Sequence, residues 1–315
     1  MINTSCFKQA VLHGAGRVRI ESREIPEKLP ADAILIKASR SIISPGTELA
    51  AYHGLIRADK YPYVPGYAAA GSVIAKGANV NHLAEGDYVY YPGFHSELMC
   101  LRNATAAVKL QSESEVEFAP YARFFQIAYT ALDVVAERWM GARILVVGLG
   151  LIGNLVGQLA SVLGGAQVLG IDSHQVRCDI AKRYGFDATF VPTQFPEDHQ
   201  ADVIIDATGT STALTSAMRW ARKGGDIVLL GTPRSPIMLD AQEIHRMGLQ
   251  IAGAHESRLS IDRKTEVAGQ MLNHLRQNRL KTSLLSTGMC EIAELELAYR
   301  RLEHKDDGLT HTIAY

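Results

Sequence analysis

The chain has 315 residues, a formal net charge of −1 and 47% apolar residues, so it is long enough for two globular domains of ordinary size. The near-neutral charge favours neither nucleic acid nor an anionic membrane as a partner, and no apolar run approaches the roughly 20 residues that span a bilayer. Residues 1–9 show no secretion signal, and the four dispersed cysteines form no CxxC pair. We therefore expect a cytoplasmic protein with reduced thiols.

Residues 1–115 predict a β-rich domain, because short runs of strand-forming residues alternate with turn signals. Such a series of short strands favours a small barrel or sandwich. The pattern changes near Glu113, after which residues 117–138 contain no glycine and predict one continuous helix. The expected strands are 8–12, 17–20, 34–39, 71–76, 87–91 and 95–101.

From Arg143 onward, strands alternate with helices such as 175–184 and 211–222. This alternation predicts a parallel sheet wound on both faces, and six strands match the doubly wound Rossmann fold. Beyond that sheet, the sequence predicts one helix, 291–303, and one strand, 310–315, which we expect to return to the first domain. The expected strands of the sheet are 143–147, 167–171, 188–191, 203–207, 226–230 and 249–253.

The first strand of this series runs directly into a glycine-rich turn with the spacing GxGxxG. Its glycines serve a tight turn, a close approach of backbone to a pyrophosphate and close packing of helix on strand, and the helix start attracts phosphate. Asp172 follows nineteen residues after Gly153, where a carboxylate binds the ribose hydroxyls and repels a 2′-phosphate. This favours NAD over NADP, although Arg177 could reach the same ribose and arginines neutralise the phosphate in NADP sites.

The predicted cofactor-binding residues come from this turn, from the second strand and helix, and from the loops after the fourth and fifth strands. Ligands of doubly wound sheets bind at these carboxyl ends of the strands. The residues after the fourth and fifth strands, Thr208, Gly209, Gly231 and Thr232, also suit ordinary turns between strands and helices. For the whole motif, the alternative is a βαβ unit that binds nothing. The set is Gly148, Gly150, Leu151, Ile152, Gly153, Asp172, Arg177, Thr208, Gly209, Gly231 and Thr232.

The order of the parts and four local motifs resemble the medium-chain dehydrogenase/reductase superfamily. Residues 64–71 look like its P-G-H-E-x-x-G segment, 85–89 like its G-D-R-V turn, 177–185 like its second Rossmann helix and 251–258 like its I-x-G-S…R stretch. The resemblance implies an α/β protein with a GroES-like β-barrel domain and a doubly wound six-stranded Rossmann domain. It places residues 1–118 and 285–315 in the first domain and 119–284 in the second, and it implies an NAD(P)-dependent enzyme that forms a homodimer.

Zinc-dependent members of the superfamily carry a cysteine in G-I-C-G-T-D and the His and Glu of G-H-E. Here the cysteine position holds Ser44 or Pro45, and the G-H-E positions hold Gly66, Tyr67 and Ala68. The four-cysteine structural lobe is also absent. Because zinc needs three or four such ligands, the resemblance implies a zinc-free member with no metal site. An alternative metal set of His53, His95 and Cys100 has no supporting spacing.

Within the superfamily, residues 44–48 and Tyr67 look most like the bacteriochlorophyllide a dehydrogenase branch, which oxidises a secondary hydroxyethyl group with NAD. Ala68 departs from that branch, which tends to keep a glutamate at this position. The branch therefore indicates the type of chemistry rather than the substrate.

Without zinc, hydrogen-bond donors have to stabilise the charge that develops on the substrate oxygen. Tyr67 takes the place of a zinc-binding histidine, so its hydroxyl could meet that oxygen, and a positive nicotinamide would lower its pKa from about 10. By resemblance, Thr47 starts the proton relay of the family. The histidine that follows in that relay is replaced here by Ala50, so Glu48 or His53 could end the relay. Each residue also has a structural alternative. Tyr67 could be a packed aromatic and Thr47 a turn cap. Glu48 could pair with an arginine, and His53 could lie at the surface.

The leading interpretation is a zinc-independent, NAD(H)-dependent oxidoreductase that interconverts a secondary alcohol and a ketone. Its small-molecule substrate is expected to be bulky or cyclic, because loops 52–63 and 92–97 are rich in aromatic residues. One alternative is an NADPH-dependent quinone or enoyl reductase, and another is a nucleotide-binding relative without catalysis. The apolar strand 249–253 further suggests pairing with a second copy at the edge of the sheet.

Overall fold

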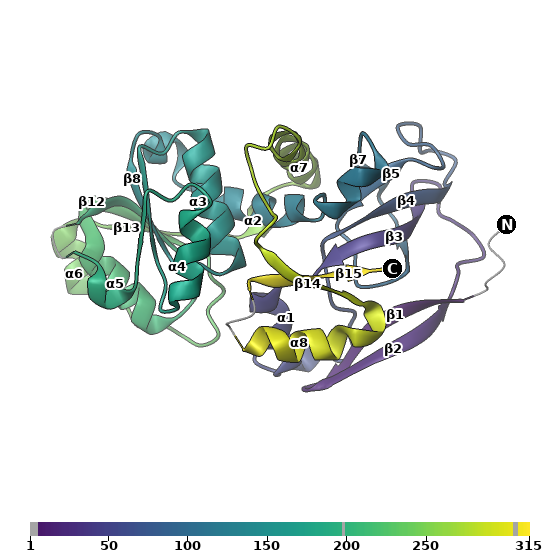
Figure 1. Ribbon diagram of the computed structural model, residues 1–315, viewed down its shortest axis with the longest axis horizontal. Coiled ribbons are helices and arrows are strands. Elements are labelled where there is room, and N and C mark those ends of the chain that lie inside the picture. Colours follow the sequence, from purple (N-terminus) through teal and green to yellow (C-terminus); the bar gives the residue numbers. More distant parts are fainter. Residues whose placement is uncertain (1–5, 197–198, 305–307) are drawn as a thin grey trace. The chain divides into compact units, whose positions relative to one another are not determined.

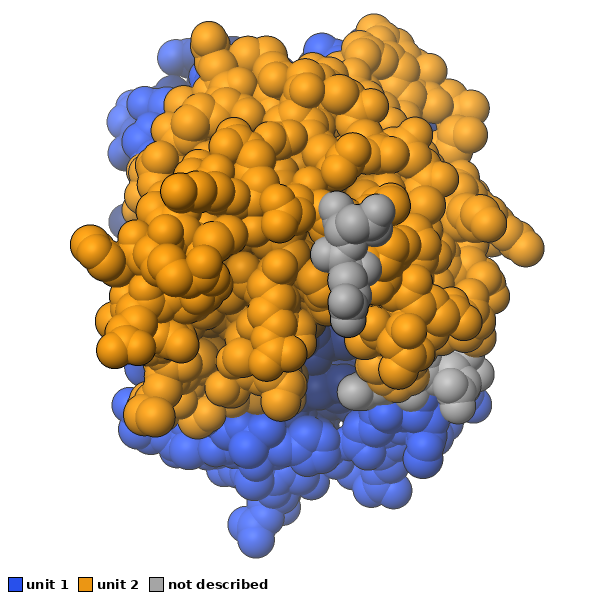
Figure 2. All heavy atoms as spheres, turned by 90° about the vertical axis from the view of Figure 1, so that its left-hand side faces the viewer, with its two compact units in different colours: residues 1–123, 260–273, 285–315 blue, residues 124–259, 274–284 orange. Residues whose placement is uncertain are grey.

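The computed structural model describes residues 6–196, 199–304 and 308–315 (Figure 1). It contains two compact units, which Figure 2 distinguishes by colour. Unit 1 comprises residues 1–123, 260–273 and 285–315, and unit 2 comprises 124–259 and 274–284. Residues 260–273 thus group with unit 1, whereas the expected division placed them in the second domain. No helix among the described residues is long and apolar enough to cross a membrane.

Unit 1 is built on a seven-stranded sheet in the order β14-β15-β3-β4-β5-β7, with β6 paired to β3. Strands β14 and β15 run parallel to each other, and β15 pairs antiparallel with β3, so the C-terminal segment completes a sheet begun near the N-terminus. A separate hairpin joins β1, Cys6–Gly14, to β2, Arg17–Glu24. The strands of the sheet are β3 Ile34–Ile42, β4 Ala69–Lys76, β5 Tyr88–Tyr91, β6 Leu98–Leu101, β7 Val108–Lys109, β14 Ser286–Glu291 and β15 Thr310–Ala314.

Two apolar clusters stabilise unit 1. One lies in the sheet around Ile34, Val73 and Tyr91, and the other joins helix α1, Pro45–Tyr52, to helix α8, Leu295–Glu303. The sequence did not predict α1, whose first residues, Pro45 and Gly46, suggest a turn, although proline suits the first position of a helix. It also missed β14, because that strand has few apolar residues; the expected helix 291–303 begins as the 3₁₀ turn Ile292–Glu294.

Unit 2 is a six-stranded parallel sheet in the order β10-β9-β8-β11-β12-β13. This is the strand order of the doubly wound dinucleotide fold, so the predicted sheet is confirmed. The order reverses between β8 and β11, which is where such sheets bind ligands at their carboxyl ends. The strands are β8 Arg143–Val147, β9 Gln167–Ile171, β10 Ala188–Phe190, β11 Ala201–Asp206, β12 Ala221–Leu229 and β13 Gln250–Gly253.

The predicted continuous helix 117–138 is wrong. Pro120 precedes α2, which ends at Asp133, and Ala136 then adopts a left-handed backbone with φ of 49° that a helix cannot continue through. Helices α3 to α6 connect the strands of unit 2, α2 precedes β8, and the residues of α2 and α7 divide between the two units. These helices are α2 Tyr121–Asp133, α3 Leu151–Leu163, α4 Gln175–Lys182, α5 Ser211–Trp220, α6 Ala241–Met247 and α7 Ile261–Arg276.

Candidate functional site

The turn between β8 and α3 accepts only glycine at two of its positions. Gly148 has a φ of 91°, and a Cβ there would lie 2.5 Å from Cγ2 of Thr208. A Cβ on Gly153 would lie 1.8 Å from the carbonyl oxygen of Gly148. Helix α3 therefore begins tightly against the end of β8, with Gly150 as a cap that has no capping side chain. Its first N–H groups, on residues 151–153, have no partner within the helix and suit a phosphate.

Asp172, directly after β9, lies beside this turn and is 6% exposed. Its Oδ2 accepts a hydrogen bond of 2.8 Å from the Leu149 amide and lies 3.6 Å from Nη1 of Arg177. Its Oδ1 accepts a bond of 2.9 Å from the His174 amide and lies 3.0 Å from Nδ1 of the same residue. The structure thus brings together Asp172, Arg177 and the glycine turn at the carboxyl ends of β8 and β9.

Two polar groups near this turn have no hydrogen-bond partner within the described residues. They are Nε of Arg177 and the side-chain amide of Asn154, a fully buried residue in the first turns of α3. Because unpartnered buried polar groups are costly, they are places where a polar ligand can be accommodated. The glycine turn, the free helix N-terminus, Asp172 and Arg177 together fit a nicotinamide dinucleotide.

The loops after β11 and β12 contact each other through their glycines. A Cβ on Gly209 would lie 2.5 Å from the carbonyl oxygen of Thr232, and one on Gly231 would lie 2.3 Å from the amide nitrogen of Gly209. Asp206, which the sequence analysis missed, accepts bonds from the Thr208 amide at 2.8 Å and hydroxyl at 2.6 Å. Burial raises the pKa of the Asp206 carboxyl, whereas these donors lower it. Thr208 therefore holds its own loop in shape.

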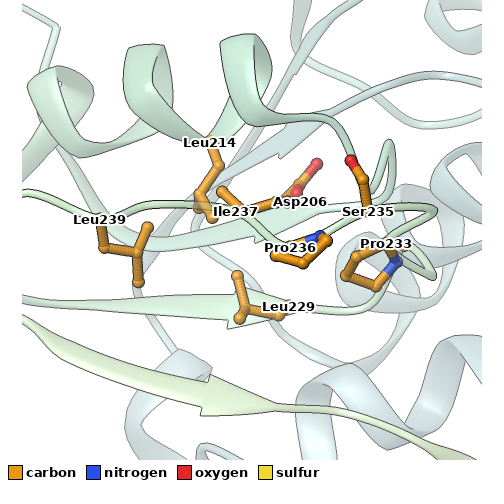
Figure 3. Close-up of a pocket in the computed structure, with 9 residues that line it drawn as sticks. Asp206, Leu214, Leu229, Pro233, Ser235, Pro236, Ile237 and Leu239 are labelled. Carbon is orange, nitrogen blue, oxygen red and sulfur yellow. The ribbon is translucent and has the colours of Figure 1, made fainter.

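An open cavity of about 270 Å³ lies next to these loops in unit 2. Figure 3 shows Leu214 descending from α5 toward Ile237, with the Asp206 carboxylate and the Ser235 hydroxyl as polar groups. The cavity therefore presents a mainly apolar surface beside residues predicted to bind the cofactor. Its lining comprises Asp206, Leu214, Leu229, Gly231, Pro233, Ser235, Pro236, Ile237 and Leu239.

In unit 1, the structure brings Tyr67 and Thr47 together at the start of α1. Ser44 caps this helix, but its hydroxyl accepts a hydrogen bond from the Tyr67 hydroxyl instead of making a capping bond. Burial raises the pKa of Tyr67, whereas hydrogen bonds with Ser44 and Thr47 lower it. The guanidinium of Arg123 lies 5.5 Å from the centre of the Tyr67 ring. Tyr67 is therefore a protonated phenol held between two hydroxyl groups.

Glu48 is buried one residue after Thr47 and is 3% exposed. Its Oε1 accepts a bond of 2.7 Å from the Ser44 amide, and its Oε2 accepts one of 2.7 Å from the Tyr299 hydroxyl and lies 2.8 Å from Nε2 of His95. Its partners are thus a histidine and a tyrosine rather than an arginine. The sequence did not predict either as a partner of Glu48, because they lie 47 and 251 residues away along the chain. It named His95 only in the alternative metal set with His53 and Cys100, which form no metal-holding group among the described residues.

The structure does not place His53 beside Tyr67, Thr47 and Glu48. His53 follows the end of α1, six residues after Thr47, which is about 9 Å along a helix axis. Its exposed ring lies 2.9 Å from the Glu303 carboxylate. It therefore forms a surface pair between the ends of α1 and α8.

The residues at the superfamily's zinc positions do not fit a zinc ion. Ser44, Pro45, Tyr67 and Ala68 offer no thiolate, imidazole or carboxylate, which are the groups that bind zinc in proteins. Within the part of the chain that the structure describes, no three His, Cys, Asp or Glu residues form a group that could hold a metal.

A GroES-like barrel sheet, a doubly wound sheet and a glycine turn with its acid define the class of two-domain dinucleotide-binding proteins. The sequence model of the "Alcohol dehydrogenase GroES-like domain" matches residues 30–125, and that of the "Zinc-binding dehydrogenase" matches residues 152–273. Together they span more than two thirds of the chain. The chain belongs to the medium-chain dehydrogenase/reductase superfamily.

Among curated proteins, the chain is similar to the D-guloside 3-dehydrogenase of Escherichia coli (strain K12), with 35% identity over 173 residues. This match covers 51% of the chain and 49% of the relative, so the chain spans about half the length of this relative. A solved alcohol dehydrogenase from Escherichia coli CFT073, complexed with NADH, has 20% identity and a TM-score of 0.87 over 99% of this chain and 100% of that one. A dehydrogenase from Sinorhizobium meliloti 1021, bound to NADP, has 17% identity and a TM-score of 0.84 over 99% and 100%. These two likenesses confirm the predicted fold.

Proposed function

We propose that this protein is a zinc-independent oxidoreductase that uses NAD(H) to interconvert a secondary alcohol and a ketone. The observation that carries the proposal is the Tyr67 hydroxyl, held by Ser44 and Thr47 where zinc-dependent members have metal ligands. The glycine turn and Asp172 in unit 2 support nicotinamide binding. A bound nicotinamide supplies or accepts the hydride.

The residues of unit 2 bind and orient this cofactor. The free amides at the start of α3 bind its pyrophosphate, and the Asp172 carboxylate accepts hydrogen bonds from the adenosine ribose. The same carboxylate repels a 2′-phosphate, which favours NAD(H) over NADP(H). Arg177, 3.6 Å from Asp172, is the one residue of this group that favours the phosphate.

Tyr67 meets the charge on the substrate oxygen. During reduction, the Tyr67 hydroxyl would turn its proton from Ser44 to the carbonyl oxygen and give it up there as the carbonyl carbon is reduced. The raised pKa keeps this hydroxyl protonated in the free protein. Solvent then returns a proton to Tyr67 through the adjacent Ser44 and Thr47 hydroxyls, each of which takes up one proton as it passes one on. Oxidation of the alcohol runs through the same groups in reverse.

We propose a ring-bearing secondary alcohol or its ketone as the substrate. The observation that supports this class is the similarity to a relative named as a dehydrogenase of a glycoside. The aromatic residues Tyr52, Tyr61 and Tyr63 of the expected substrate loop instead pack in the cluster that joins α1 to α8. An activated double bond, reduced with NADPH, is the second candidate, and the Arg177 side chain beside Asp172 is the observation that favours it.

The test is oxidation of NADH and NADPH by metal-stripped protein against matched panels of ketones and conjugated enones. Ketone turnover with NADH and without metal supports the proposal, and Tyr67→Phe should then lower kcat by roughly 100-fold or more. Tyr88→Phe, in the same unit, is the control and should retain full activity. Turnover confined to enones with NADPH establishes the second candidate. Cofactor binding without any turnover establishes a non-catalytic relative.

We also propose a cytoplasmic homodimer that pairs through strand β13. This strand is at the edge of its sheet, and in the described residues it pairs only with β12. An exposed strand edge is a template for pairing with a second copy. Light scattering at micromolar concentration should give twice the chain mass, and a monomer would refute the dimer.

A further inference from the structure

A buried hydrogen-bonded chain runs through unit 1 behind Tyr67. Glu48 lies 2.8 Å from Nε2 of His95, Nδ1 of His95 lies 2.8 Å from the Ser41 hydroxyl, and that hydroxyl lies 2.7 Å from the Tyr315 hydroxyl. Tyr299 donates to the same Glu48 oxygen at 2.7 Å. His95 and Ser41 are 0% exposed. A buried carboxylate with this many donors is fully compensated and cannot reorient cheaply.

This chain reaches Tyr67 through the start of helix α1. Oε1 of Glu48 accepts a hydrogen bond of 2.7 Å from the Ser44 amide, which sets the position of Ser44. The Ser44 hydroxyl in turn accepts the hydrogen bond from the Tyr67 hydroxyl. His95 therefore acts on Tyr67 through two intermediate residues, because it holds the Glu48 carboxylate that holds Ser44.

His95 also supports the backbone that carries Tyr67. Its amide donates a hydrogen bond of 2.9 Å to the carbonyl oxygen of Pro65. Its ring lies so close to Gly66 that a Cβ on this glycine would be 2.8 Å from Nδ1. The imidazole thus fills the space behind the Pro65–Gly66 turn, and its removal frees both the turn and the Glu48 carboxylate.

We propose that His95 is a positioning residue of the active site, which holds the Tyr67 hydroxyl in its reactive position through Glu48 and Ser44. The inference rests on the proposed function, in which Tyr67 meets the substrate oxygen. It assigns no proton transfer to His95, whose ring is fully buried. Glu48 is accordingly a structural anchor and not the end of a proton relay.

The proposal requires one tautomer of the imidazole. An ionised carboxylate only accepts hydrogen bonds, so Nε2 of His95 carries the proton that faces Glu48. With its proton on Nε2, the ring accepts at Nδ1 from the Ser41 hydroxyl, which accepts from Tyr315. Burial raises the pKa of both Tyr315 and Tyr299, so these phenols keep the protons that they donate. Every hydrogen bond of the chain thus points toward Glu48.

The test compares His95→Gln with His95→Asn in the full chain. The terminal amide of glutamine can take the place of Nε2 and still donate to Glu48, whereas asparagine reaches only the Nδ1 position, near Ser41. Both variants lose the imidazole and keep a buried amide. We expect His95→Asn to lower kcat roughly 10- to 100-fold, the usual cost of removing an outer partner of a functional group. His95→Gln should retain most of kcat, and NADH affinity should be unchanged in both.

A double-mutant cycle with Tyr67→Phe gives the second readout. In the Tyr67→Phe background, His95→Asn should lower activity little further, because His95 acts by positioning the hydroxyl that this background already lacks. Equal losses for Gln and Asn, or additive losses with Tyr67→Phe, would overturn the inference and leave the proposed function intact. Absence of carbonyl turnover in the unmodified protein would instead overturn the proposed function.

Nitrogen-15 NMR of the imidazole gives a readout that does not depend on turnover. It should show that Nε2 of His95 carries a proton. Protonation at Nδ1 alone would overturn the inference whatever the substrate.

Discussion

The amide of Leu149 donates a 2.8 Å hydrogen bond to Oδ2 of Asp172, which joins the glycine turn after β8 to the end of β9. The carboxylate proposed to recognise the ribose is therefore held by the loop proposed to receive the pyrophosphate. The position of the Asp172 side chain therefore depends on the geometry of the glycine turn as well as on strand β9.

We expect Asp172→Ala to weaken NADH binding by roughly 10- to 100-fold, because hydrogen bonds to a charged group are lost. NADPH binding should weaken much less, since the repulsion of its 2′-phosphate disappears as well. Calorimetric titration with both cofactors measures the change. Asp179→Ala, an exposed position on α4, is the matched control and should bind both as the unmodified protein does. Equal weakening of NADH and NADPH would contradict the assigned role.

Gly66→Ala and Gly86→Ala separate backbone strain from a steric clash. Both glycines have a left-handed backbone, with φ of 91° and 89°. A Cβ on Gly86 meets nothing within 4 Å, whereas one on Gly66 would lie 2.8 Å from the backbone nitrogen of His95. We expect Gly86→Ala to lower the free energy of unfolding by about 1–2 kcal/mol and Gly66→Ala by a further ~1–3 kcal/mol. Urea unfolding measures both, and equal losses would show that the His95 contact can relax.

Two helical glycines should respond to alanine with opposite signs. A Cβ on Gly157 of α3 would lie 1.9 Å from Cζ of Phe186, whereas one on Gly269 of α7 meets nothing within 4 Å. Alanine in a helix interior is favoured over glycine by roughly 0.5–1 kcal/mol. Gly269→Ala should therefore stabilise the protein by about that amount, and Gly157→Ala should destabilise it through overpacking by ~1–3 kcal/mol. Thermal or urea unfolding decides; a stabilising Gly157→Ala would mean that Phe186 moves aside.

Stability should fall in alkaline solution. Burial raises the pKa of Tyr63 to about 12, and it also raises the pKa of Tyr67, Tyr299 and Tyr315. The folded state thus favours the neutral phenols, so their contribution is fully present below the unfolded pKa of about 10 and is lost as the pH rises through the folded values. Urea midpoints should stay level below that pH and fall above it. Tyr63→Phe should make the decline shallower; an unchanged decline would exclude Tyr63 from it.

The sequence predicted unit 2 more fully than unit 1 because its signals are local. Expected strands 143–147 and 167–171 coincide with β8 and β9, and the glycine spacing, the following helix and Asp172 all lie within one βαβ unit. Apolar runs and glycine turns of this kind are formed by neighbouring residues. In unit 1, the helix α1 was missed, since its start resembles a turn and it is stabilised by α8, more than 240 residues later.

The sequence by itself determined the two-domain class, the dinucleotide turn and the loss of the usual zinc ligands, because each is a matter of residue type at short spacing. Only the tertiary structure decided which partners Tyr67, Glu48 and His53 have. Glu48 meets His95 and Tyr299 inside the core, whereas His53 pairs with Glu303 at the surface. These contacts join residues far apart in the chain. They form only when the strands and helices pack together and bury the side chains that have to find hydrogen-bond partners.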